Sequence, residues 1–576
     1  MAPVPSAGRP VRSLRGRWRY RFVVGLIWFA VFAAAGAGWR YARTSGPAFG
    51  PIIVISIDSL RADRLPLYGY PKAHTPAIDA LAADSVVFDR AYAHSPLSLP
   101  SNVALLSGLL PFQSGVRDEV GFPLSEGVAL VPQMLHRRGF KTGGVVSSYL
   151  LRKETGLGGA FGFFDDEVGG ADASAPRFAR DGADTLKVAE QWIDTIATGR
   201  FFLFLHLSGP TEKASYDARV ADADELVGQL IAFLKKRGLY SGGVIVLTAG
   251  HGEALGDHGE EGHGLFLYEP VVRVPLVIKL PRRDGGGRHS AALVQHIDVV
   301  PTILDLVGAP RPSKLGGRSL RNVLDSPAAT IPPRQVYAES FAPRFRFGWS
   351  EVQSLTDDRH RYNKSPRPEL YDVLQDPRER NDLSESDAAT AEGLRTALDA
   401  LTANLPAPQP TPVPAPERER LAAAGYVVVE GVAPTLTTDV KDRTVLDNTY
   451  WQAGRLAEAG KMAGAIAAYK EVVKADPSVA AAWERLAALL VEAGRFNEAG
   501  DALISLLGLF PDDARVAAAE ARLQPLAAAE SPDRAMLAAS VWAAIGEKGR
   551  AAEIRTATRK SAGDAAVRKA EAALRK

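Results

Sequence analysis

Three of the ten histidines in the chain, His251, His258 and His263, lie within thirteen consecutive residues, HGEALGDHGEEGH. This segment directly follows the apolar run VIVL at 244–247, and glycine stands at five positions of 251–264. Glycine lets a backbone approach a ligand closely. A solvated acidic loop would account for the carboxylates but not for three histidines, so the segment indicates a metal or anion site.

Two other polar residues stand where predicted elements begin or end. Asp58 follows the β-branched run IIVISI at 52–57, and it is either an ordinary carboxylate at a strand end or a metal ligand. Ser98 begins the segment SLPSN ahead of an apolar helical stretch. A hydroxyl at a helix N-terminus lies where aligned N–H groups stabilise negative charge. A simple serine N-cap is the alternative for Ser98.

The elements that must position these residues alternate between strands and helices. Short apolar runs bounded by turn residues predict strands, and an amphipathic pattern at 222–236 predicts a helix; the predicted strands cover 52–57, 143–146, 201–207, 244–247 and 275–280. This alternation predicts an α/β fold with a mostly parallel sheet sandwiched by helices. In such sheets the chemistry gathers at the carboxyl ends of the strands.

Residues 51–400 resemble the sulfatase branch of the alkaline phosphatase superfamily. The segments that carry this resemblance follow the order of that family, and they are ISIDSLRADRLPLYGY at 55–70, residues 74–111, residues 251–278, residues 294–310 and a closing strand segment at 367–383.

The resemblance implies a mechanism and a role for each matching residue. A nucleophile at the first position of a C/S/T-x-P-S motif lies beside a divalent cation and attacks sulfur or phosphorus. In sulfatases proper this residue is oxidised to formylglycine, and in phosphoester-cleaving relatives it is an unmodified serine or threonine. Carried over, Asp58, Ser98 and His251 are metal ligands, Ser98 is the nucleophile, and His263 contacts the leaving group or the sulfate or phosphate. His258 is placed in that contact only by its nearness in sequence.

The chain departs from the pattern of that family at four places. Gly250 stands where the family has aspartate, Asn102 stands where it has arginine, and Ser114 stands where it has histidine. The sequence Gly-Pro-Thr at 209–211 replaces Asp-Pro-His. The chain has no cysteine, which excludes disulfides and a formylglycine made from cysteine.

Charge balance predicts an impaired metal site. One carboxylate, one imidazole and one hydroxyl leave about +1 uncompensated around a divalent cation, which usually needs more than one carboxylate. We therefore expect at most one divalent cation (Ca, Mg, Mn or Zn), weakly held, unless Asp217, Glu253 or Asp257 enters the site. Arg344, Arg346 and Trp349 are candidates for the rim of the site.

The first residues predict a membrane anchor. Eight arginines lie among residues 1–43, so the net charge of +2 leaves −6 on the rest of the chain, which disfavours nucleic acid as a partner. Residues 1–21 form a basic cytoplasmic tail, and the uncharged stretch 22–39 is long enough for one transmembrane signal anchor. The charge bias predicts a single pass through the inner (cytoplasmic) membrane, with a periplasmic body. A cleaved signal peptide or a buried core helix are the alternatives.

The C-terminal part predicts a linker and helical repeats. Proline occupies every second position from 406 to 416, which predicts a Pro-rich linker over 404–440 that follows a sulfatase-like domain at 51–403. Gly460, Ala465 and Pro477 recur 34 residues later, and residues 445–576 resemble tetratricopeptide repeats, with a plain bundle of helical hairpins as the alternative. Such repeats imply a protein partner, and we expect their removal to leave hydrolysis intact.

The sequence leaves open whether the protein is an enzyme. The main hypothesis is a membrane-anchored sulfatase-like hydrolase of sulfate or phosphate esters with an impaired metal site. The alternative is an inactive sulfatase-like pseudoenzyme that serves as a scaffold in the cell envelope through its repeats. A third reading is transfer of a phosphoryl-linked group to an envelope glycan or lipid. The combination of domains is one associated with bacteria.

Overall fold

A computed structural model describes residue 28 and residues 50–168, 178–196, 199–208, 215–426, 436–528 and 530–574. The predicted tail and anchor (1–39) lie outside these residues except for Trp28, and so does the segment 209–211. Within the described part of the chain, no helix has the length and apolar character needed to cross a bilayer. Residues 50–576 form one compact unit.

The predicted mostly parallel sheet is present. It has eight strands in the order β4-β3-β5-β1-β6-β7-β2-β8, and only β7 runs antiparallel to its neighbours. The strands are β1 Ile52–Ile57, β2 Val86–Tyr92, β3 Lys141–Val146, β4 Phe163–Asp165, β5 Phe201–Leu207, β6 Val244–Thr248, β7 Arg273–Lys279 and β8 Arg288–Gln295.

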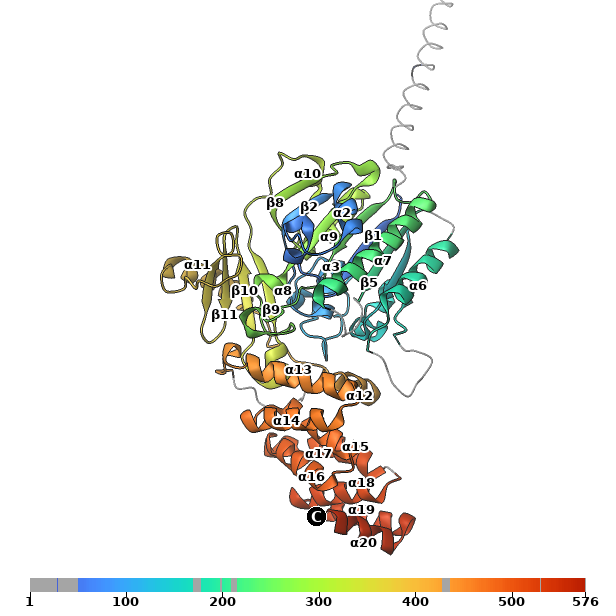
Figure 1. The fold of residues 1–576 in the computed structure, drawn as a ribbon, viewed down its shortest axis with the longest axis vertical. Coiled ribbons are helices and arrows are strands. Elements are labelled where there is room, and N and C mark those ends of the chain that lie inside the picture. The colour runs from blue at the N-terminus through green and yellow to red at the C-terminus, as the bar shows by residue number, and fades with distance from the viewer. Residues whose placement is uncertain are drawn as a thin grey trace, which may run out of the picture. The chain divides into compact units, whose positions relative to one another are not determined.

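The central strands are buried along their whole length. Every residue of β1, β5 and β6 is buried, which explains why these strands read as continuous apolar runs rather than as alternating ones. Two groups of helices cover the sheet (Figure 1). The first group is α2 Pro76–Ala83, α6 Gly182–Thr195 and α7 Tyr216–Lys236, and the second is α3 Ser98–Ser107, α5 Val131–His136 and α9 Val299–Leu306.

A second, antiparallel sheet follows in the chain. Its four strands have the order β12-β11-β10-β9, and they are β9 Val336–Ser340, β10 Val352–Thr356, β11 His360–Lys364 and β12 Glu369–Asp372. Helix α11, Ala388–Thr402, contacts β10 and β11. The predicted closing segment at 367–383 therefore contains a strand of this sheet. The short helices of the α/β region are α4 Pro111–Ser114, α8 Glu269–Val272 and α10 Arg321–Asp325.

The C-terminal part is all helical, as predicted. Gly460 and Gly494 both adopt φ near +70° at helix ends, a conformation that favours glycine and explains the 34-residue period. Ala465 and Ala499 are completely buried, so no larger side chain fits there without rearrangement. The helices are α13 Thr444–Glu458, α14 Met462–Ala475, α15 Ala480–Glu492, α16 Phe496–Gly508, α17 Asp512–Ala528, α18 Pro532–Ala544, α19 Lys548–Ala562 and α20 Asp564–Ala573.

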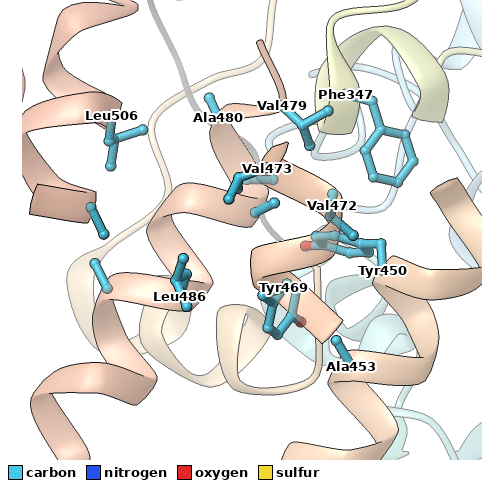
Figure 2. Close-up of a cluster of buried hydrophobic side chains, with 14 of the residues drawn as sticks. Phe347, Tyr450, Ala453, Tyr469, Val472, Val473, Val479, Ala480, Leu486 and Leu506 are labelled. Atoms are coloured by element: carbon cyan, nitrogen blue, oxygen red, sulfur yellow. The ribbon is translucent and has the colours of Figure 1, made fainter. Parts of the chain in front are cut away.

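The repeats and the α/β region share one apolar core. The ring of Phe347, between β9 and β10, lies 5.1 Å from that of Tyr450 on α13, which in turn lies 5.4 Å from Tyr469 on α14 (Figure 2). Trp349 is also buried here, and its indole N–H donates to Asp476 over 3.1 Å. Removing the repeats would expose these rings to solvent.

The segment predicted as a Pro-rich linker contacts the α/β region at several points. The backbone N–H of Thr411 donates to the carbonyl of Gly121 over 2.7 Å. The segment contains helix α12, Ala415–Ala423, from which Glu417 forms an ion pair with Arg152. After this helix, the ring of Tyr426 stacks on Phe178 at 5.1 Å. These contacts hold the segment against the surface of the α/β region.

Candidate active site

The sheet topology brings Asp58, Ser98 and His251 together. Strand β1 pairs in parallel with β5 and β6, so the residues that follow β1 and β6 emerge at the same edge of the sheet. Ser98 is the first residue of α3, and its side chain points to this edge. The Ser98 Oγ lies 3.2 Å from Asp58 Oδ1 and 3.2 Å from His251 Nε2.

The hydrogen bonds of His251 define its tautomer. Its Nδ1 lies 2.7 Å from the carbonyl oxygen of Gly252, which can only accept. In a neutral imidazole the proton is therefore on Nδ1, and the lone pair of Nε2 faces Ser98 Oγ, whose one proton is donated to Asp58 Oδ1. Rotation of this hydroxyl from Asp58 toward Nε2 gives the arrangement in which a histidine accepts the proton of a serine.

The two other predicted histidines lie in different places. The ring of His263 lies 4.1 Å from that of His251, and its Nδ1 bonds to the carbonyl of Pro96 at 2.9 Å. Burial, with the neighbouring His251 acting in the same direction, lowers the pKa of His263 to about 3. His258 instead stacks on Tyr268 at 3.6 Å and bonds to the carbonyl of Arg378, so the structure does not bring it to Ser98.

His206, which the sequence analysis did not single out, belongs to the same site. It lies on β5 and is completely buried, with its Nε2 3.9 Å from Asp58 Oδ1 and neither ring nitrogen in a hydrogen bond. Burial lowers the pKa of His206, although Asp58 opposes this. The one signal in the sequence was a polar residue inside the otherwise apolar strand FFLFLHL.

The electrostatic surroundings keep Asp58 ionised. Burial raises its pKa, but His206, His251 and His263 together with the hydroxyl of Ser98 outweigh this and lower it below its ordinary value. About a quarter of the Asp58 side chain is exposed (27%), whereas Ser98 is 2% exposed. The carboxylate is therefore the part of the site that faces solvent.

Glu119 holds the backbone of the nucleophile. Its Oε1 accepts the N–H of Ser98 over 3.1 Å, and its Oε2 accepts from Arg346 Nη2 over 2.8 Å. Burial raises the pKa of Glu119 to about 7, although Arg346 opposes this. No local pattern in the sequence marked Glu119 as part of the site. Three residues were proposed for the rim of the site. Arg346 is buried and contacts Glu119, and Trp349 is buried in the shared core, so neither lies on a rim. Arg344 pairs with Glu351.

Asn102 fills the space where the resemblance expects a metal-binding carboxylate. A Cβ at Gly250 would lie 2.9 Å from Asn102 Nδ2, closer than such contacts normally are. The same amide donates to the carbonyl of Ser98 over 2.9 Å, and its oxygen accepts from the hydroxyl of Ser56 over 2.7 Å. Asn102 is thus fixed by its own hydrogen bonds in the place of the missing acid.

The donor set does not fit a firmly bound divalent cation. Each acid that could have joined Asp58 is engaged elsewhere: Glu253 with Arg219 at 2.8 Å, Asp257 with Arg61 at 3.0 Å, and Asp217 with the hydroxyl of Tyr70 at 3.0 Å. Among the described residues, no three histidine, aspartate or glutamate side chains are arranged to hold a metal ion. A hard dication needs several oxygen ligands, and this site offers one carboxylate.

Three family models match the chain. The model named Sulfatase matches residues 51–309, and the model for the C-terminal part of N-sulphoglucosamine sulphohydrolase matches residues 259–404. A tetratricopeptide repeat model matches residues 456–523.

Individual relatives agree with these matches. The chain is 33% identical over 174 residues to an N-acetylglucosamine-6-O-sulfatase of Bacteroides thetaiotaomicron, which is 29% of this chain and 31% of that protein. The chain thus spans less than a third of that relative. A structure with its substrate D-glucosamine-2-N,6-O-disulfate has a TM-score of 0.53, 18% identity, and coverage of 62% of this chain and 98% of that one. A phosphonate monoester hydrolase of Agrobacterium radiobacter has a TM-score of 0.51, 20% identity, and coverage of 62% and 96%.

Proposed function

We propose, from the membership of residues 51–404 in the sulfatase family, that this chain is a hydrolase of sulfate or phosphate esters with an impaired cation site. The observation that carries the proposal is the position of Ser98 Oγ, 3.2 Å from both Asp58 Oδ1 and the lone pair of His251 Nε2. A serine hydroxyl with a base at this distance is an activated nucleophile.

The proposed reaction has two steps. In the first, Ser98 Oγ bonds to the sulfur or phosphorus of the ester while its proton passes to His251 Nε2, and the bond to the alcohol oxygen breaks. The alcohol leaves with a proton from His251, or from solvent that enters beside Asp58. In the second step water attacks the same sulfur or phosphorus and gives one proton to His251 Nε2. The bond from that atom to Ser98 Oγ breaks, Oγ takes the proton from His251, and sulfate or phosphate leaves. General acid–base catalysis of this kind contributes about 10²- to 10⁴-fold.

Phosphoesters are proposed to react at least as readily as sulfate esters. The chain has no cysteine, and Asn102 replaces the arginine that accompanies formylglycine in the family pattern, so Ser98 is expected to act unmodified. Relatives on this fold include one named as a sulfatase and one named as a phosphonate monoester hydrolase. Mass spectrometry of the Ser98 peptide checks this point, since oxidation to formylglycine would remove two hydrogens.

The cellular setting is also a proposal. The arginine-rich residues 1–21 and the uncharged stretch 22–39 support a single-pass anchor in the inner membrane with a periplasmic body. The helical repeats support a protein partner, because stacked helical hairpins present an extended surface. Fractionation with a protease-accessibility assay on intact spheroplasts tests the orientation.

A specific observation favours a second candidate, an inactive scaffold of the envelope. Asn102 fills the space beside Gly250 and is held by two hydrogen bonds, and the neighbouring acids are paired with other residues. In this case the fold and repeats remain for association while turnover is lost.

One experiment separates the two candidates. The full chain in detergent is analysed for bound metal and assayed with an aryl phosphate and an aryl sulfate, alongside Ser98→Ala. Turnover that Ser98→Ala abolishes supports the hydrolase. The absence of turnover with either ester, with and without added Ca²⁺, Mg²⁺, Mn²⁺ or Zn²⁺, supports the scaffold.

A further inference from the structure

Arg346 lies between the nucleophile and the repeat region. It belongs to the π-helical turn Pro343–Phe347 and is 4% exposed. On one side its Nη2 donates to Glu119, the carboxylate that accepts the N–H of Ser98. On the other side its guanidinium lies over the rings of Tyr426 and of Trp451 on α13, at 5.3 and 5.4 Å from their centroids.

The guanidinium of Arg346 also acts electrostatically on four buried carboxyl groups. It lowers the pKa of each of them against the effect of burial; they are Asp118, Glu119, Glu260 and Asp447. Glu260 lies in the histidine-rich loop and Asp447 on α13, so the cluster joins three parts of the molecule. Among the residues that the structure describes, one oxygen of Asp118 and one of Glu260 have no hydrogen-bond partner.

A second contact joins α13 to the histidine-rich loop. The side chain of Asn448 donates from Nδ2 to the carbonyl of Gly259 over 2.8 Å, and its oxygen accepts the N–H of Glu261 over 3.0 Å. These two bonds satisfy both ends of the amide and fix the backbone two residues before His263. Gly259 has φ of +83°, and the position of a Cβ there would lie 3.2 Å from the hydroxyl of Thr444, so the loop backbone lies close to the start of α13.

We propose that the first repeat helix, α13, is a structural part of the ester-cleaving site and that Arg346 is its positioning residue. Arg346 fixes the backbone of Ser98 through Glu119, while Asn448 fixes the loop that carries His263. A displacement of α13, such as a partner bound to the repeats would produce, therefore changes the geometry at Ser98. An effect of α13 on turnover rests on the proposed function. The structural link from α13 and Arg346 to the backbone of Ser98 does not depend on it.

A merely structural role for Arg346 predicts something different. Loss of any buried arginine–carboxylate pair destabilises a protein, because the remaining charge is left unpaired. Arg361 is a matched control, since it is completely buried and paired with Glu269 and Glu379 at 2.8 and 3.1 Å. If Arg346 positions Ser98, its substitution must change the backbone or the reactivity of Ser98. Substitution of Arg361, with a similar loss of stability, must leave both unchanged.

The experiment uses the full chain in detergent with Arg346→Gln, Arg346→Lys and Arg361→Gln. The readouts are hydrogen–deuterium exchange of the peptide 97–107, the rate at which a fluorophosphonate probe labels Ser98, and the thermal midpoint. We expect Arg346→Gln to speed exchange at 97–107 and to slow labelling about tenfold, with Arg346→Lys in between, because lysine keeps the charge but not the fork. Arg361→Gln should lower only the midpoint.

The loop contact has its own pair of variants. Asn448→Ala should speed exchange of the peptide 257–265, whereas Thr449→Ala should not, because the Thr449 hydroxyl bonds only within its own helix, to the carbonyl of Val445. If Arg346→Gln matches Arg361→Gln at 97–107 and Asn448→Ala matches Thr449→Ala at 257–265, the proposal is overturned. A wild-type chain that is not labelled at Ser98 contradicts the proposed function instead, and the exchange data still decide the inference.

Discussion

The site at the strand ends and the interface around Arg346 lie on either side of Ser98, and they are built in opposite ways. The first consists of one carboxylate and three buried imidazoles brought together by neighbouring parallel strands. The second has four buried carboxyl groups around one guanidinium, contributed by segments far apart in the chain. Carboxyl groups are therefore present close to Ser98, but they are buried around the guanidinium of Arg346 and do not lie beside Asp58.

The two regions differ in how their acidic residues are paired. Asp257 and Glu253 are paired with arginines, while the acids between the α/β region and the repeats are buried. Burial of charge is unfavourable unless it is compensated.

The largest expected effect is on turnover, and it tests the strand-end site. If the chain hydrolyses an aryl phosphate, Ser98→Ala should reduce kcat by about 10³-fold or more, because it removes the hydroxyl that lies beside Asp58 Oδ1 and His251 Nε2. Ser85→Ala is the control, since its hydroxyl bonds to the carbonyl of Leu81, away from the site. Equal activity of Ser98→Ala and wild type would exclude Ser98 as the nucleophile.

The next effect tests the shared core that joins the repeats to the α/β region. Tyr450→Ala should lower the free energy of unfolding by about 3–5 kcal/mol, because Tyr450 is completely buried between Phe347 and Tyr469. Tyr450→Phe removes only the hydroxyl that donates to Gly425 and should cost about 1 kcal/mol. Denaturant unfolding measures both. Two separate transitions in the wild type would show that the regions unfold independently.

A smaller effect, dependent on pH, tests the charge balance of the interface. Burial, reinforced by Asp447, raises the pKa of Glu260 to about 8 from an ordinary value of 4.5. Folding therefore favours the protonated form, and its stabilising contribution is lost as the pH rises toward 8. Glu260→Gln should match wild type near pH 5 and exceed it near pH 8 by on the order of 2 kcal/mol. Thermal melts of both proteins across this range measure the difference, and a constant difference would contradict the raised pKa.

The smallest effect tests whether Asn102 prevents an acid at position 250 from helping to bind a cation. Gly250→Asp alone should not create a cation site, because its side chain meets the amide of Asn102, and it should destabilise the fold by about 1–3 kcal/mol. Combining it with Asn102→Ala should relieve the contact and allow Ca²⁺ or Mn²⁺ to bind beside Asp58. Calorimetric titration checks this, with Asn102→Ala as the control. Tight binding by Gly250→Asp alone would show that Asn102 is no obstacle.

Some of the site was predictable from the sequence because it depends on local patterns. An apolar run followed by a polar residue predicts a strand end, and parallel strands place such ends at one edge, so Asp58 and His251 were found. His206 was missed because a buried histidine within an apolar strand reads as core until the neighbouring strand is known. His258 was included only for its nearness in sequence, and its backbone turn, with φ of +54°, directs it elsewhere.

The sequence by itself determined the class of fold, the 34-residue helical repeat and the place of Ser98 at the start of a helix. These follow from periodicity, turn residues and motif spacing, which act over short distances along the chain. Only the tertiary structure decided which partner each charged group has. The links from Arg346 to Glu119 and from Asn448 to Gly259 join residues 227 and 189 positions apart. Long-range pairing depends on how all the elements pack together, and no local pattern encodes it.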